Sequence, residues 1–150
     1  MGQQQLLLLV LSTVIVGLAT VAGIQAFSEN QAQATQDALI QRATSVATDI
    51  VAAHNKPSQM GGIDVTSVST NSKVANAIGL STASGFSADG AGDGATCDIK
   101  TSSNNSGSYS SGFSQQVVVN CSSGDGATVE VGVDPSADDQ IETVIVSTAS

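Results

Sequence analysis

Basic and aromatic residues are both scarce in this 150-residue chain. Four Lys and Arg side chains stand against 13 Asp and Glu, which gives a formal net charge of −9. Proteins that bind nucleic acids present basic surfaces to the phosphate backbone, so this balance argues against a nucleic acid as partner. Aromatic residues make up 3% of the chain and Trp is absent. The sequence therefore lacks stacking platforms for bases, and Val, Ile, Leu and Ala must build any core.

The parts of a catalytic site are also missing. The chain has one histidine, His54, which stands at the end of a predicted helix, where a cation suits the helix dipole. The sequence contains no Gly-rich phosphate loop, no serine elbow and no cluster with metal-ligand spacing. We therefore expect a protein that is not an enzyme, without catalytic, cofactor-binding or metal residues.

An uncharged apolar block fills the first part of the chain, from Leu6 to Ile24. Together with residues 25–27 it is about 22 residues long, and a helix of that length spans about 33 Å, enough to cross the hydrocarbon core of a bilayer. No Lys or Arg precedes it, whereas a secretory signal peptide has a basic start and a shorter apolar core. The block therefore predicts a membrane-spanning or helix-packing segment.

The same helix is expected to continue far beyond the apolar block. Neither Gly nor Pro occurs from Ser28 to His54, which predicts one helix of about 50 residues, about 75 Å long, that ends near Pro57. Apolar residues recur at steps of three and four in its second half: Leu39, Ala43, Val46, Ile50 and Ala53. Such a stripe must pack on another element.

The C-terminal part of the chain supplies a partner for this stripe. Four stretches are predicted as strands: 95–100, 114–121, 127–133 and 141–148. Alternation of apolar and polar residues in them predicts a half-buried antiparallel sheet with one polar face, which the amphipathic half of the helix would cover. The predicted fold class is α+β, a long N-terminal helix packed on a C-terminal antiparallel sheet. The expected regions are an apolar polymerisation or transmembrane helix (1–27), its amphipathic continuation (28–56), a loop-rich αβ region (57–94) and a sheet head (95–150).

This order of elements resembles a type IV pilin or a close relative. The similarity extends over the whole chain in element order, and its sequence-specific part lies in the opening "MGQQQLLLLVLSTVIVGLATVAGI". Gln5 stands where most type IV pilins carry a glutamate that pairs with the amino terminus of a neighbouring subunit. Met1 is either the initiator or the residue that a leader peptidase exposes and that is then methylated. The resemblance implies the major structural subunit of an extracellular filament.

The implied partners are further copies of the chain in a helical homopolymer, the inner-membrane pilus assembly machinery, and the lipid bilayer before assembly. The expected location is the cell surface, with adhesion, motility, DNA uptake and phage reception open as purposes. Apolar and small residues allow close contact between helices. The predicted polymerisation residues are Gln5, Leu6, Leu7, Leu8, Leu9, Val10, Leu11, Val14, Ile15, Gly17, Leu18, Ala19, Ala22 and Gly23.

Two other functions remain open at this point. One is a pseudopilin of a secretion system, which shares the architecture but forms a short fibre. The other is a monomeric membrane-anchored surface domain, in which the apolar block is a plain anchor and the acidic head binds a ligand or cation.

Three further features concern the head. Cys97 and Cys121 are the only cysteines, and an even count outside the cytoplasm favours a disulfide over a pair of free thiols. Asn104 begins a glycosylation pattern, as does Asn120. Acidic loop residues permit a Ca²⁺ hypothesis, although none has the EF-hand spacing. They are Asp89, Asp93, Asp125, Asp134, Asp138, Asp139 and Glu142.

Overall fold

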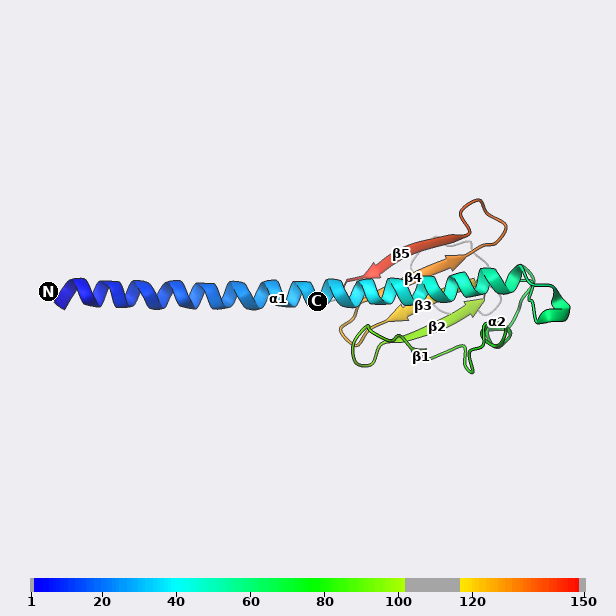
Figure 1. Ribbon diagram of the computed structural model, residues 1–150, viewed down its shortest axis with the longest axis horizontal. Coiled ribbons are helices and arrows are strands. Elements are labelled where there is room, and N and C mark those ends of the chain that lie inside the picture. Colours follow the sequence, from blue (N-terminus) through cyan, green and yellow to red (C-terminus); the bar gives the residue numbers. More distant parts are fainter. Residues whose placement is uncertain (1, 102–116, 149–150) are drawn as a thin grey trace.

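A computed structural model describes residues 2–101 and 117–148 of the chain, and it consists of a head and a projecting helix (Figure 1). Helix α1 runs without interruption over 53 residues, Gly2–His54. Its C-terminal part lies across the sheet of the head, and its N-terminal part extends away from the head into open space. The two halves of one helix therefore have entirely different surroundings.

A tight turn ends α1 and returns the chain to the helix. Pro57 lies three residues after His54, and the backbone N–H groups of Met60 and Gly62 both donate to its carbonyl oxygen. A Cβ at Gly62 would lie 1.9 Å from the carbonyl oxygen of Lys56, so only glycine fits at this close approach. The N–H of Ile63 then donates to the carbonyl of Ala53. This turn aligns the following segment with the last turn of the helix.

Short elements connect α1 to the sheet. They are the 3₁₀ helix η1 (Ser58–Met60), helix α2 (Asn71–Ala77) and the two-residue strand β1 (Phe86–Ser87). Helix α2 is tied to the sheet by one side chain, because the Oδ1 atom of Asn71 accepts hydrogen bonds from the N–H and the hydroxyl of Thr101. The region predicted as loop-rich thus contains two short helices and a two-residue strand.

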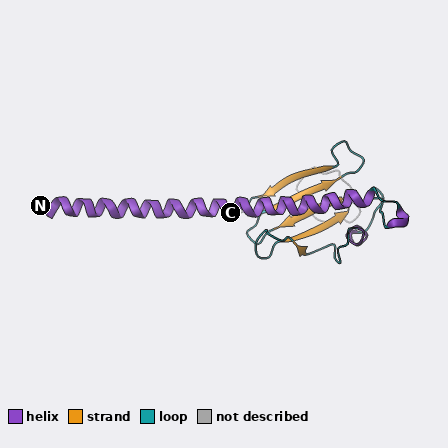
Figure 2. Cartoon of the chain, in the orientation of Figure 1, coloured by secondary structure: helices purple, strands orange, loops and turns teal. Residues whose placement is uncertain are grey.

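The sheet is an antiparallel meander in which each strand pairs with the next one in sequence, in the order β1-β2-β3-β4-β5. The four long strands are β2 (Thr96–Thr101), β3 (Val117–Ser122), β4 (Thr128–Val133) and β5 (Ile141–Ser147). In Figure 2 the helix crosses one face of these strands. It packs mainly on β4 and β3, near the middle of the sheet.

The core lies between α1 and this face. From the helix it takes the stripe that the sequence predicts, since Leu39, Ala43, Val46, Ile50 and Ala53 are all buried. From the strands it takes every second residue, because successive side chains point to opposite faces. The strand residues are Cys97, Ile99, Val117, Val119, Cys121, Val129, Val131 and Val133. The guanidinium of Arg42 lies 5.8 Å from the ring centroid of Phe86, which extends the helix–sheet contact to β1.

The predicted α+β fold, with a long helix packed on an antiparallel sheet in the manner of a pilin, is confirmed. Its details differ in three places. The helix ends at His54 rather than at residue 56, since Pro57 disfavours helical geometry in the residue before it. Strand β1 was not predicted, because two residues carry no readable alternation.

The third difference concerns the second face of the sheet, which is not uniformly polar and exposed. Val118 and Glu130 point to that face and are buried. The Nδ2 group of Asn120 on β3 donates to Oε1 of Glu130 on β4 over 2.9 Å. Alternation assigns a residue to a face but does not tell how much of that face is exposed to water. The predicted strand at 114–121 extends in part outside the described residues.

Candidate polymerisation surface

The stem, defined as residues 2–27 of α1, is exposed along its whole length. Its large apolar side chains are each between 52% and 71% exposed. They occupy all sides of the helix and are Leu6, Leu7, Leu8, Leu9, Val10, Leu11, Val14, Ile15, Val16, Leu18, Val21, Ile24 and Phe27. An apolar surface of this extent in a water-soluble monomer would be unusual, and it marks a site that contacts protein or lipid.

The contrast with the second half of the same helix is sharp. Residues 39–53 bury one stripe and expose the other faces, as an amphipathic helix does. In the stem, the apolar stretch is not buried on any side. Among the described residues, α1 is the one helix long and apolar enough to cross a membrane. In the part of the chain that the structure describes, the head supplies no cover for the stem.

Seven uncharged polar side chains lie in the stem, and two of them, both threonines, bind to the backbone of the same helix. The hydroxyl of Thr13 donates to the carbonyl of Val10 over 2.9 Å, and that of Thr20 to the carbonyl of Gly17 over 2.8 Å. Such bonds to the preceding turn remove the cost of placing a hydroxyl in an apolar environment. The first charged side chain along the chain is Glu29, beyond the stem.

A shallow apolar hollow lies at the N-terminal end of the stem. Its lining residues are Gln3, Leu6, Leu7, Val10, Leu11 and Val14. These positions follow one another at steps of three and four and therefore share one side of the helix. Gln3 is the one polar residue among them. The predicted polymerisation residues include Gln5 but not Gln3, although the spacing from Gln3 to Leu6 and Leu7 places it on this side of the helix.

The glycines of the stem stand in open space among the described residues. A Cβ added at Gly17 or Gly23 would meet nothing within 4 Å. Glycine destabilises a helix interior by about 1 kcal/mol relative to alanine, so these residues do not stabilise the isolated helix. Together with Ala19 and Ala22 they form flat areas on which another helix can approach closely. Of the predicted polymerisation residues, the structure places all on the stem and brings none into the head.

The two cysteines form the predicted disulfide. Cys97 on β2 is paired in register with Cys121 on β3, and the bond joins them within the buried core. The disulfide therefore cross-links strands β2 and β3 on the face of the sheet that α1 covers. The alternative of two free thiols is excluded.

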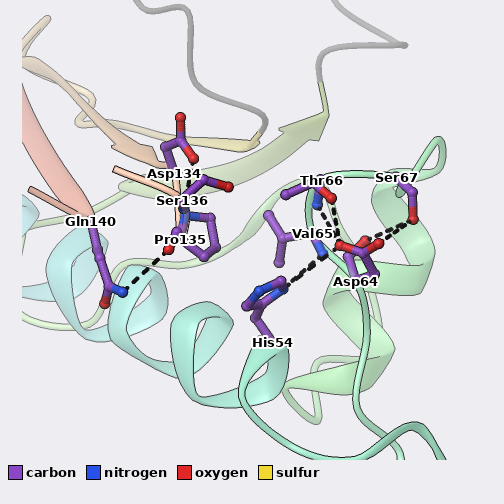
Figure 3. A network of polar contacts seen from close by, with 9 residues as sticks. All are labelled: His54, Asp64, Val65, Thr66, Ser67, Asp134, Pro135, Ser136 and Gln140. Atoms are coloured by element: carbon purple, nitrogen blue, oxygen red, sulfur yellow. Dashed lines mark hydrogen bonds and ion pairs between the residues drawn. The ribbon is translucent and has the colours of Figure 1, made fainter. Parts of the chain in front are cut away.

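A polar network surrounds His54 at the end of α1 (Figure 3). The Nδ1 atom of His54 accepts a hydrogen bond from the N–H of Val65 over 3.2 Å and lies 3.9 Å from Oδ1 of Asp64. The hydroxyls of Thr66 and Ser67 both donate to the Asp64 carboxylate. These hydrogen bonds lower the pKa of Asp64 from 3.8, and the bond from Thr66 makes the larger contribution. These bonds hold the turn after α1 in place, so His54 has a structural role.

Two residues of the acidic loops use their carboxylates in a similar local way. Asp89 accepts a hydrogen bond from the hydroxyl of Ser87, and Asp134 accepts one from the N–H of Ser136. The side chain of Gln140 donates to the carbonyl of Pro135, which closes the turn between β4 and β5 (Figure 3). Among residues 2–101 and 117–148, no three His, Cys, Asp or Glu side chains gather where a metal ion could bind.

Two predicted modification sites, Met1 and Asn104, lie outside the described residues. The second glycosylation pattern begins at Asn120, whose side chain is bound to the buried Glu130 and whose neighbour Cys121 is in the disulfide. An Asn side chain held in this way is not presented as a glycan acceptor.

The stem is thus the surface of this protein that requires a partner, and its residues were readable from the sequence. Comparisons of the chain with models of protein families, with curated proteins and with solved structures find no match.

Proposed function

We propose that this chain is the major structural subunit of a type IV pilus-like extracellular filament, which polymerises through its stem. The observation that carries the proposal is the bare stem, an apolar helix that projects from a folded head and is covered by none of the other described residues, 28–101 and 117–148. A helix that is apolar on every side is stable in lipid and equally stable among copies of itself.

This property allows one surface to serve two states of the subunit. Before assembly, the stem spans the inner membrane and the head lies outside it. During assembly, neighbouring stems replace lipid around the same side chains, with the help of an inner-membrane assembly machinery. A contact that relates successive subunits head to tail does not close, so it generates a fibre.

The head fits the exterior of such a fibre. Its own core is closed by α1, and the disulfide between Cys97 and Cys121 stabilises it outside the cytoplasm. The chain carries a net charge of −9, and no acidic or basic side chain lies in the stem. The charge therefore lies beyond the stem, where it keeps the filament surface hydrated.

The same architecture supports two alternatives. A pseudopilin of a secretion system would use the stem in the same way but form a short fibre. A monomeric anchored domain would leave its stem in lipid and present the acidic head to a ligand or cation. The extent of assembly distinguishes the three.

The test is cryo-electron microscopy of material sheared from producing cells, combined with the intact mass of the subunit. Long helical fibres with a core of packed stems are the expected result, and the mass reports whether the first residue is Met1 and whether it is methylated. Short fibres associated with a secretion complex would favour the pseudopilin. A protein that stays in the membrane as a monomer would contradict filament formation.

A further inference from the structure

We propose that a second copy of the stem occupies the apolar hollow, that this contact contains no side-chain ion pair, and that the amides of Gln3, Gln4 and Gln5 set its register. This inference rests on the proposed function and specifies its contact. The three glutamines are named here the glutamine collar.

The charge distribution gives the first argument. From Gly2 to Ser28 the chain has no Asp, Glu, Lys, Arg or His. Two stems that lie side by side therefore have no side chains with which to form an ion pair. Their attraction must come from apolar contact and from hydrogen bonds between neutral groups.

The size of the apolar surface argues for a second copy as the occupant. Thirteen large apolar side chains of the stem are each more than half exposed. If each exposes on the order of 100 Å², the stem offers about 1,300 Å², whereas a stable interface needs about 800 Å² from each partner. This area lies on all sides of the helix, so one neighbouring stem covers only part of it, and several neighbouring stems are needed to cover the whole.

The glutamine collar supplies the register. Consecutive helix positions are about 100° apart, so three glutamines in a row point to three sides of the helix. Gln3 closes one end of the hollow, and Gln4 lines a second hollow with Leu7, Leu8 and Leu11. A side-chain amide both donates and accepts, so amides of two copies can pair with each other. An apolar contact alone permits sliding, but a shifted register would leave these amides unpaired in apolar surroundings at a cost in free energy.

Four polar side chains of the stem lie outside the collar: Ser12, Thr13, Thr20 and Gln25. The hydroxyls of Thr13 and Thr20 are bound to backbone carbonyls of their own helix. The collar holds three of the four side-chain amides of the stem, and the fourth, Gln25, lies at the opposite end.

The first experiment measures self-association of the full chain in micelles of an uncharged detergent by sedimentation equilibrium. We expect the association constant to change less than about twofold between about 50 mM and about 1 M NaCl, since no ion pair is screened. The Gln3→Glu variant should associate at least about tenfold more weakly at neutral pH and recover below about pH 4, where its carboxyl group is protonated. Gln33→Glu, which adds the same charge at an exposed position beyond the stem, is the matched control and should behave as the wild type.

The second experiment tests the register separately from the affinity. A spin label on Leu9→Cys reports the distance between copies, because both native cysteines are in the disulfide and do not react. We expect a narrow distance distribution for the wild-type collar. With Gln3, Gln4 and Gln5 all replaced by Leu, association should persist but the distribution should broaden.

The outcomes separate the two proposals. Three results would overturn the inference without contradicting filament formation. They are self-association or fibres that dissociate in high salt, a Gln3→Glu variant that associates as the wild type does, and a distance distribution that stays narrow without the collar. If the wild type neither self-associates in micelles nor forms fibres on cells, the proposed function itself fails.

Discussion

Cys97 and Cys121 are joined across β2 and β3 at directly opposed positions, with their α-carbons 4.0 Å apart. Both side chains are fully buried, on the face of the sheet that α1 covers. The bond closes a loop with a sequence separation of 24 and joins two adjacent strands of the core. It therefore stabilises the head at the place where the helix packs.

Removal of the disulfide should destabilise the head without affecting the stem. We expect the double variant Cys97→Ala and Cys121→Ala to lose about 3 kcal/mol of unfolding free energy, since a loop of this length restricts the unfolded chain. Urea unfolding followed by circular dichroism measures the loss. Addition of a reductant should lower the stability of the wild type and leave the variant unchanged. A variant as stable as the wild type would contradict the structural role of the bond.

A matched pair of leucines tests the division of α1 into two halves. Leu39 is fully buried against the sheet, and Leu8 is 67% exposed on the stem. Leu39→Ala should reduce the unfolding free energy of the head by about 2–5 kcal/mol, because it leaves a cavity. Leu8→Ala makes the same chemical change and should leave the unfolding of the head unaltered. Equal effects in urea titrations would show that the stem contributes to the stability of the head.

Asn71 is expected to hold α2 on the sheet. Its Oδ1 atom accepts from the N–H of Thr101 over 2.9 Å and from the hydroxyl over 3.1 Å, and Thr101 is buried. Asn71→Ala should therefore cost about 1–3 kcal/mol, since two buried donors lose their acceptor. Hydrogen exchange at the Thr101 amide should accelerate at the same time. Asn76→Ala, at an exposed position of the same helix, is the control and should change neither quantity.

The Asp64 turn gives a prediction for the dependence on pH. Hydrogen bonds from Thr66 and Ser67 lower the pKa of Asp64 from 3.8, so its folded-state pKa lies below its unfolded-state pKa. The stabilisation is therefore present above the unfolded pKa and is lost as the pH falls through the folded pKa. Carboxyl chemical shifts in an NMR titration should show a midpoint below 3.8 in the wild type. Thr66→Val should raise this midpoint more than Ser67→Ala does, since Thr66 supplies the largest contribution; the reverse order would contradict the assignment.

A charge inside the stem should abolish filaments without disturbing the head. Gly23 has free space around it within the chain, so Gly23→Asp causes no internal clash. An unpaired carboxylate among packed apolar helices costs several kcal/mol, and we expect no fibres in electron micrographs of sheared material. Asp138→Asn, at an exposed position of the turn before β5, should assemble normally. Fibres of normal yield from Gly23→Asp would contradict packing through the stem.

Much of the fold could be predicted because its signals are local. The absence of Gly and Pro from residues 28–54 predicts an uninterrupted helix, and the spacing from Leu39 to Ala53 predicts its buried stripe. The candidate site was equally readable, because a long apolar block shows its need for a partner without reference to the rest of the chain. Strand β1 and the glycine turn at Gly62 were missed, since they depend on contacts between segments rather than on composition.

The sequence by itself determined the length of the helix, the uncharged stem and the alternation of the strands, since each follows from neighbouring residues. Only the tertiary structure decided that Cys97 faces Cys121, that Asn71 holds Thr101 and that Glu130 is buried beside Asn120. Register and burial depend on how the strands meet and on what packs against them. Those relationships join residues far apart in the chain, and no local pattern encodes them.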